Sequence, residues 1–239
     1  MPLVLKPAEP GVPWPPGDGW QPLFDGKTLD GWRVVEESSF AQHGAVRVDG
    51  DRIVLEAGNN RTGVACLREV PTTDYELALE AMRETGAADF CNLVFPVGES
   101  HCALALGGYV TMAGLDQVDG QPFNENEATQ RLAYQPREWY RILVRVTQAR
   151  IEAWVGGEKV IDLPRQGHVV TLREDYQPLR PVGVSTWDTT GVLRRIQVRP
   201  LKPDPGQGKH TRPGDAEIAP CLMGSAGLPQ ESGLACGTR

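Results

Sequence analysis

Apolar and polar residues alternate with a period of two along most of this chain. In residues 74–84, DYELALEAMRE, the side chains of Tyr75, Leu77 and Leu79 fall on one face and polar side chains fall on the other. Residues 139–147, WYRILVRVT, repeat the pattern. A period of two is typical of an extended strand with one face in a core, whereas a helix needs a period near 3.6. The chain is therefore predicted to fold as half-buried β-strands.

Turn residues divide these strands into short lengths. The sequence holds 27 glycines and 20 prolines, and Gly156-Gly157 joins two alternating runs as a hairpin turn would. Strands of this kind bury their apolar faces by stacking two sheets. We predict an all-β fold, an antiparallel two-sheet sandwich of the jelly-roll type. The sequence leaves room for one short helix, in 172–177 or near 124–130.

Composition divides the chain into three parts. Residues 1–18 are Pro-rich and are predicted to form an extended arm or linker, and residues 19–202 hold the sandwich. Residues 203–239 are rich in Gly, Pro and Ser and are predicted to be a largely disordered tail. The first 19 residues lack a basic segment followed by an apolar one, so a cytoplasmic protein is expected as written. A periplasmic or secreted protein is expected if the N-terminus is truncated.

Several classes of protein are disfavoured. A net charge of −7 without a basic cluster argues against a nucleic-acid partner, and the absence of a run of about 18 apolar residues argues against a membrane span. The motifs GxSxG, GxxxxGK(S/T), GxGxxG and HExxH do not occur.

Cys66, Cys91 and Cys102 lie in strand-like segments and are interpreted as small buried hydrophobes. Cys221 and Cys236 can pair only in an oxidising compartment.

An aromatic-rich segment opens the predicted sandwich. Residues 19–32 read GWQPLFDGKTLDGW. In sandwiches the first strand often lies beside the last, and the apolar side chains of this segment are expected to seal that edge: Trp20, Leu23, Phe24 and Trp32. The two Asp-Gly pairs supply turns that tolerate a positive φ.

This opening motif, the alternating strands and the ending GVLRRIQVRPL (191–201) together resemble the 3-keto-disaccharide hydrolase domain family. The resemblance implies a concanavalin A-like lectin/glucanase jelly roll, and a hydrolase or lyase that acts on 3-keto-glycosides. It implies a small carbohydrate or glycoside as the partner. Family members often carry GNSGIFFRG and YEVQILDN in their middle strands, whereas this chain has different residues across 88–120. A non-catalytic carbohydrate-binding or interaction module of the laminin-G-like type is the alternative, and an accessory domain without catalytic residues is a third.

The chemistry implied by the resemblance needs one base and one electrophile. A base removes the proton on C2, and a divalent metal ion or a hydrogen-bond donor stabilises the enolate on the C3 ketone oxygen. The alternation predicts that Asn92, His101, Glu76 and Glu80 turn away from the core, with small alanines at 103 and 105 leaving room for a ligand. We assign His101 as the base or a metal ligand, with Asn92 and Glu127 assisting; the simpler alternative is an exposed histidine at a strand start.

Polar and aromatic side chains supply the predicted substrate contacts. The loop 114–131 can bind sugar hydroxyls or a hard cation such as calcium, or can simply be solvated. Trp187 is predicted to face outward, where its ring stacks on a pyranose, although packing at a sandwich corner explains it equally well. The candidate substrate-binding residues are Trp187, Asp188, Tyr109, Asn124, Glu125, Asn126 and Arg131.

Overall fold

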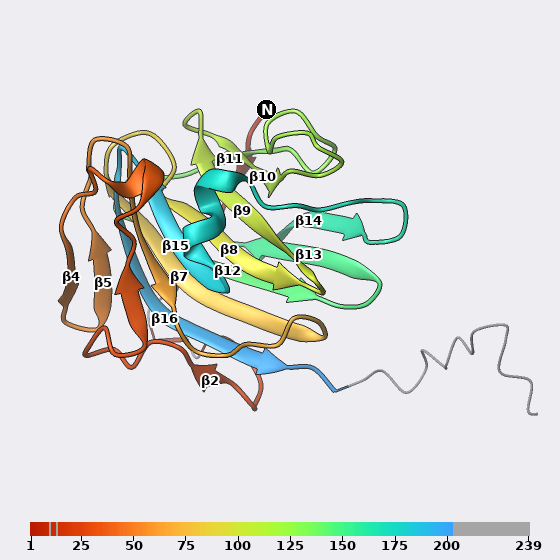
Figure 1. Ribbon diagram of the computed structural model, residues 1–239, viewed down its shortest axis with the longest axis horizontal. Coiled ribbons are helices and arrows are strands. Elements are labelled where there is room, and N and C mark those ends of the chain that lie inside the picture. Colours follow the sequence, from red (N-terminus) through yellow and green to blue (C-terminus); the bar gives the residue numbers. More distant parts are fainter. Residues whose placement is uncertain (10, 13, 203–239) are drawn as a thin grey trace, which may run out of the picture. The chain divides into compact units, whose positions relative to one another are not determined.

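The computed structural model describes residues 1–9, 11–12 and 14–202, and these residues form two stacked β-sheets (Figure 1). The first sheet runs in the order β1 (Leu3–Val4), β11 (Gln130–Ala133), β10 (Met112–Asp116), β9 (Ser100–Gly108), β8 (Cys91–Val97), β15 (Val182–Trp187), β6 (Arg61–Cys66) and β3 (Trp32–Val34). The second runs in the order β14 (Glu158–Pro164), β13 (Arg150–Val155), β12 (Trp139–Val146), β7 (Tyr75–Thr85), β16 (Thr190–Pro200), β5 (Arg52–Leu55) and β4 (Val46–Asp49), with β2 (Gln21–Pro22) on β16. The predicted all-β, two-sheet sandwich is confirmed.

The core lies between the two sheets and follows the period-two pattern. Leu77 and Leu79 of β7, Leu93 of β8, Leu104 of β9 and Ile142 of β12 all point into it and are fully buried. Their polar neighbours in sequence lie on the outer faces. Burial of such side chains stabilises each by about 1.5–3 kcal/mol relative to exposure, which holds the two layers together.

Two 3₁₀ turns cover part of the outer face of the first sheet. They are η1 (Ser38–Phe40) and η2 (Glu174–Leu179), and η2 contacts β6 and β15. Figure 1 shows η2 across the face of this sheet. Phe40, Tyr176 and Leu179 pack there on Ala65 and Val94, forming a second small apolar cluster. The turn η2 overlaps the predicted short helix at 172–177.

The aromatic opening segment closes the sandwich as predicted. Strand β2 pairs with β16 through Pro22 and Gln197, so the beginning and the end of the domain lie side by side. Leu23, Phe24 and Trp32 are buried, and the Trp32 indole donates a 2.8 Å hydrogen bond to the Leu23 carbonyl. Trp20 instead lies at the surface, where the Arg199 guanidinium stacks on its ring.

The Pro-rich segment 1–18, expected to be an arm, lies against the sandwich in its described part. Strand β1 adds to the first sheet in parallel with β11, and Leu5 is buried. The guanidinium of Arg141 donates to the carbonyls of Glu9 and Val12 on the outer face of the second sheet. The segment therefore crosses from one sheet to the other. The predicted tail 203–239, with Cys221 and Cys236, lies outside the described residues.

Glu76 and Glu80 correct one expectation. Both lie on β7, which pairs with β12 and β16 in the second sheet, so they do not share a face with Asn92 and His101. Glu76 is fully buried and accepts hydrogen bonds from Arg145 at 2.8 Å and Arg199 at 2.6 Å. Alternation predicted which side chains leave the core, but it does not say which sheet a strand joins.

Other local predictions hold. Gly156 and Gly157 form the β13–β14 hairpin turn, with φ values of 59° and 85° that favour glycine. Cys66, Cys91 and Cys102 are buried free thiols. In the described part of the chain, no helix has the length and apolar character to cross a membrane.

Candidate functional site

A cleft of about 520 Å³ opens at one end of the outer face of the first sheet. Because neighbouring strands are antiparallel, the starts of β6 and β8 meet the ends of β9 and β15 at this edge. Its polar lining residues are Arg61, Asp89, Arg173 and Asp188. Its apolar lining residues are Tyr109, Val110, Phe123 and Trp187, with Ala87, Ala88 and Gly108 between them.

Arg61 is a buried cation in the wall of this cleft. Its guanidinium carbon lies 4.3 Å from the centre of the Tyr176 ring and 4.7 Å from that of Trp187. Nη2 donates a 3.1 Å hydrogen bond to Asp175, whereas Nε and Nη1 have no partner among the described residues. Two aromatic contacts and one carboxylate thus fix a guanidinium that keeps unused donors.

Two carboxylates lie near this guanidinium. Asp89 lines the cleft and accepts a 3.0 Å hydrogen bond from the Asn92 amide. Burial raises the pKa of Asp89, and the Asn92 hydrogen bond and the nearby Arg61 oppose that effect. Burial likewise raises the pKa of Asp116, whose Oδ1 accepts from the Phe123 amide and whose Oδ2 lies 3.6 Å from Arg173 Nε.

Buried polar atoms without partners gather in this part of the sheet. They are Nε and Nη1 of Arg61, Oδ1 of Asn92, Oγ of Ser185 and Oδ2 of Asp116. Asn92 and Ser185 are direct partners on β8 and β15. Each such atom costs about 1–3 kcal/mol when nothing satisfies it, and native proteins keep few of them. Their concentration beside one cleft indicates a site that water or a ligand completes.

Exposed aromatic rings border the mouth of the cleft. Tyr109 is 72% exposed and stacks on Phe123, with ring centres 6.3 Å apart and planes inclined by 23°. Trp187 is 38% exposed and faces outward, as predicted from alternation. Asp188 follows it at the surface. Of the predicted substrate-binding residues, the structure brings Tyr109, Trp187 and Asp188 together.

His101 lies on the outer face of the first sheet, opposite Pro96 and half-buried. Burial and the nearby Arg180 lower the pKa of its imidazole. In the described residues its side chain has no hydrogen bond or ion pair. Five residues of β9 separate it from Gly107 near the cleft end, a span of about 20 Å. The structure therefore does not bring His101 together with Asn92 in the cleft.

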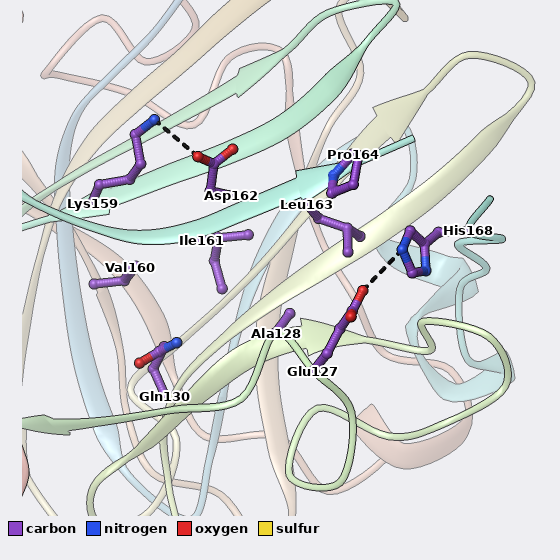
Figure 2. Close-up of a pocket in the computed structure, with 10 residues that line it drawn as sticks. All are labelled: Glu127, Ala128, Gln130, Lys159, Val160, Ile161, Asp162, Leu163, Pro164 and His168. Atoms are coloured by element: carbon purple, nitrogen blue, oxygen red, sulfur yellow. Dashed lines mark hydrogen bonds and ion pairs between the residues drawn. The ribbon is translucent and has the colours of Figure 1, made fainter. Parts of the chain in front are cut away.

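Glu127 lies in a different pocket of about 360 Å³, between β14 and the loop before β11 (Figure 2). There its carboxylate lies 3.0 Å from Nε2 of His168, and Asp119 forms a 2.8 Å hydrogen bond with Nδ1 of the same ring. The carboxylates raise the pKa of His168, with the Asp119 hydrogen bond as the largest effect. Glu127 is thus placed with His168, whereas sequence analysis had expected it beside His101.

The loop 114–131 is held by its own hydrogen bonds. The Asn126 amide donates to the carbonyls of Leu115, Gln121 and Pro122. Asn124 contacts Glu125 at the surface, and Arg131 is exposed. Within residues 1–9, 11–12 and 14–202, no three His, Cys, Asp or Glu side chains are arranged to hold a metal ion. The divalent metal ion that the resemblance implies therefore stays a prediction, which removal of metal by EDTA would test.

Comparisons with known proteins agree with this architecture. Among solved structures, a protein of unknown function with a galectin-like fold from Bacillus subtilis is similar at a TM-score of 0.52 and 10% identity, covering 75% of this chain and 94% of that one. A Crh5 transglycosylase in complex with NAG gives 0.50 and 10%, covering 78% and 86%. A glycosyl hydrolase family protein from Mycobacterium fortuitum gives 0.50 and 8%, covering 75% and 97%. At such identities these likenesses show the fold alone.

No curated protein matches the sequence. A family model does: the 3-keto-alpha-glucoside-1,2-lyase-like domain matches residues 19–199, which include the opening motif, the cleft and the last strand. This match confirms the family indicated by the opening motif and by the terminal strand. The chain therefore belongs to the 3-keto-alpha-glucoside-1,2-lyase-like domain family.

Proposed function

We propose that the chain is an enzyme that cleaves 3-keto-glycosides by elimination, with Asp89 as the base and Arg61 as the electrophile. The observation that carries this proposal is the pairing, in one cleft, of a guanidinium with unused donors and a carboxylate of raised pKa. Family membership supports the substrate class.

The reaction follows from the acidity of the proton beside a ketone. The Asp89 carboxylate takes the proton from C2, and the C–H electron pair forms the C2–C3 double bond of an enolate. Negative charge develops on the C3 oxygen, where Arg61 donates hydrogen bonds that strengthen as the charge grows. The enolate then re-forms the C3 ketone while its C2 electron pair forms a C1–C2 double bond. The C1 oxygen substituent leaves with the electron pair of the broken C1–O bond and takes the proton from Asp89. Addition of water to C1 of the unsaturated product would complete a hydrolysis.

The surroundings suit these two roles. A raised pKa makes the Asp89 carboxylate a stronger base than an ordinary aspartate, and Asn92 orients it through Oδ2. The rings of Tyr176 and Trp187 and the Asp175 carboxylate hold the Arg61 guanidinium in one orientation. A donor fixed before the reaction needs no reorganisation when charge develops.

The test is release of the glycosidic group from ethyl 3-keto-glucoside and 3-keto-trehalose, with and without EDTA. The wild-type chain is expected to turn over at least one of them, and Asp89→Asn and Arg61→Met are expected to lose activity about 100-fold or more. His101→Ala is the matched control and is expected to remain active. No turnover by the wild-type chain overturns the proposal. Loss of activity only in His101→Ala moves the base to that residue, and loss with EDTA moves the electrophile to a metal.

A non-catalytic carbohydrate-binding module is the second candidate. The exposed aromatic rings of Tyr109 and Trp187 favour it, because a sugar face stacks on such rings without any acid or base. Glycan binding that survives Asp89→Asn, fails in Trp187→Ala and is never followed by product release would support this candidate against the enzyme.

A further inference from the structure

We infer that the leaving group taken by this cleft is flat and apolar, so that the substrate is an aryl-bearing 3-keto-glycoside in preference to a disaccharide. This inference rests on the proposed function. It concerns only the part of the substrate that leaves with the glycosidic oxygen and that would occupy the mouth of the cleft.

The exposed apolar side chains of the cleft lie at its mouth, beside Asp188, which is also exposed, and Arg173, which is partly exposed. Arg61 and Asp89 contribute the charged groups near the buried unpartnered atoms. At the mouth Tyr109 is 72% exposed, Val110 52% and Trp187 38%. A second sugar would bring several hydroxyl groups to this mouth, where Asp188 and Arg173 can bond some of them but the exposed apolar side chains would leave others without partners. A flat apolar group would instead bury the exposed rings.

The aromatic part of the mouth is held in place from below. Phe123 packs directly over Gly108 at the end of β9, so closely that a Cβ on Gly108 would collide with the ring. The same ring supports Tyr109 by stacking, which leaves the opposite face of Tyr109 open. Phe123 is in turn tied to Asp116 through its backbone amide. The exposed ring of Tyr109 is therefore held in place by Phe123 and by the contacts of Phe123 with Gly108 and Asp116.

The backbone that presents this platform is strained. Tyr109 has a φ of 45° and Val110 a φ of 75°, and a β-branched residue rarely adopts the left-handed region. Arg83, buried behind the turn, donates a 3.3 Å hydrogen bond to the Val110 carbonyl. Such strain persists where surrounding contacts impose it, and it occurs most often at binding sites. Here its effect is to expose two apolar side chains at the cleft mouth.

Trp187 supplies the other apolar surface. One face of its indole covers Arg61, and the residue still exposes part of its ring. The two rings that remain available, Tyr109 and Trp187, both line the one cleft. A planar group leaving from C1 can therefore contact aromatic surface while the keto sugar occupies the polar interior.

The experiment compares 2-phenylethyl and ethyl 3-keto-glucosides, whose leaving alcohols have similar acidity, together with 3-keto-trehalose. The wild-type chain is expected to favour the phenylethyl compound about tenfold in kcat/KM over both others. Tyr109→Asn removes the ring and suits a positive φ; it is expected to abolish that preference, because KM rises more for the phenylethyl compound than for the ethyl compound. Tyr109→Phe keeps the ring and is expected to keep the preference.

Each outcome has one meaning. Equal turnover of the phenylethyl and ethyl compounds, or faster turnover of 3-keto-trehalose, overturns the inference and leaves the proposed function standing. An equal loss on all substrates in Tyr109→Asn also overturns it, because the residue then acts on the keto sugar or the fold. If no substrate is cleaved, the proposed function fails, and the inference fails with it.

Discussion

Arg61 and Trp187 are direct partners across strands β6 and β15, and the guanidinium carbon of the arginine lies 4.7 Å from the centre of the indole ring. The pair joins the two kinds of surface in the cleft, a buried cation inside and an exposed aromatic ring at the mouth. Substitution of either residue therefore tests a different part of the proposed chemistry.

Arg61→Lys keeps the positive charge but removes the planar group that stacks between two rings. We expect kcat/KM on a 3-keto-glucoside to fall about 100-fold or more, because a lysine does not place a donor in the same fixed orientation. We expect a loss of only about 1–2 kcal/mol in the free energy of unfolding, from the lost cation–π contacts. Steady-state kinetics and urea unfolding measure the two effects. Near-normal activity would show that charge alone suffices.

Asp89→Asn is expected to separate stability from activity. Burial raises the pKa of Asp89 above its ordinary value of 3.8, so the folded state disfavours the charged form. This destabilisation is absent below the pKa that Asp89 has in the unfolded chain. It grows as pH rises through the higher pKa that Asp89 has in the folded protein. The variant should therefore melt at a higher temperature than wild type at pH 7, with the difference shrinking toward pH 4.

The activity of the wild-type chain should show the same titration. If the charged form of Asp89 is the base, kcat/KM rises with pH through its raised pKa, above pH 3.8. The variant should lack activity across this range. A variant that melts lower at pH 7, with wild-type kinetics, would remove Asp89 from the proposal.

Much of the fold follows from the sequence because burial on one strand face is a local property. The alternation in 74–84 and 139–147, the Gly156-Gly157 hairpin and the opening segment all appear as predicted. The pairing of strands does not follow from alternation. Glu76 and Asn92 both leave the core, yet they lie on opposite sheets because β7 joins β12 and β16, while β8 joins β9 and β15.

The site was only partly predictable for the same reason. Arg61 is the first residue of β6, and Asp89 comes just before β8. Alternation from Gly63 and Ala65 places Arg61 on the outer face. Neither residue can be identified from the sequence, because no local pattern shows that the starts of β6 and β8 lie at the same end of the sheet. The sequence predicts His101 as the base because it is the lone histidine of its region. The length of β9 places it far from the cleft end. Burial of Asp89 is a property of the assembled sandwich.

Glu76→Ala is expected to be severely destabilising. The carboxylate is fully buried between Arg145 and Arg199, and its removal leaves two guanidinium groups facing each other. We expect a loss of about 3–5 kcal/mol in the free energy of unfolding, measured in urea. Glu56→Ala is the matched control at an exposed ion pair with Arg47 on the same sheet, and a loss below about 1 kcal/mol is expected there. Similar losses in both variants would contradict this account of the second sheet.

Val110→Asn should stabilise the protein. Val110 has a φ of 75°, which is costly for a β-branched residue by about 1–3 kcal/mol, whereas asparagine enters this region readily. Because the side chain is about half exposed, little packing is lost, and we expect a gain of about 1 kcal/mol in thermal or urea unfolding. Val169→Asn, at an exposed valine without a positive φ, controls for the change in polarity and should be neutral.

His168→Gln should make the stability of the chain less dependent on pH. The imidazole lies between Asp119 and Glu127 and links the loop before β11 to the segment after β14 (Figure 2). Those carboxylates raise the pKa of His168 above 6.5 in the folded protein. The stabilisation by the charged ring is therefore full below the pKa that His168 has in the unfolded chain, and it is lost as pH rises through the pKa in the folded protein. The melting temperature of wild type should therefore exceed that of His168→Gln at pH 5.5, and the difference should shrink by pH 8.5. In a Glu127→Gln background, the difference in melting temperature caused by His168→Gln should be smaller, because one of the two carboxylates that contact the imidazole is no longer charged. A difference between wild type and His168→Gln that stays constant from pH 5.5 to 8.5 would mean that the ring acts there as a neutral hydrogen-bonding group.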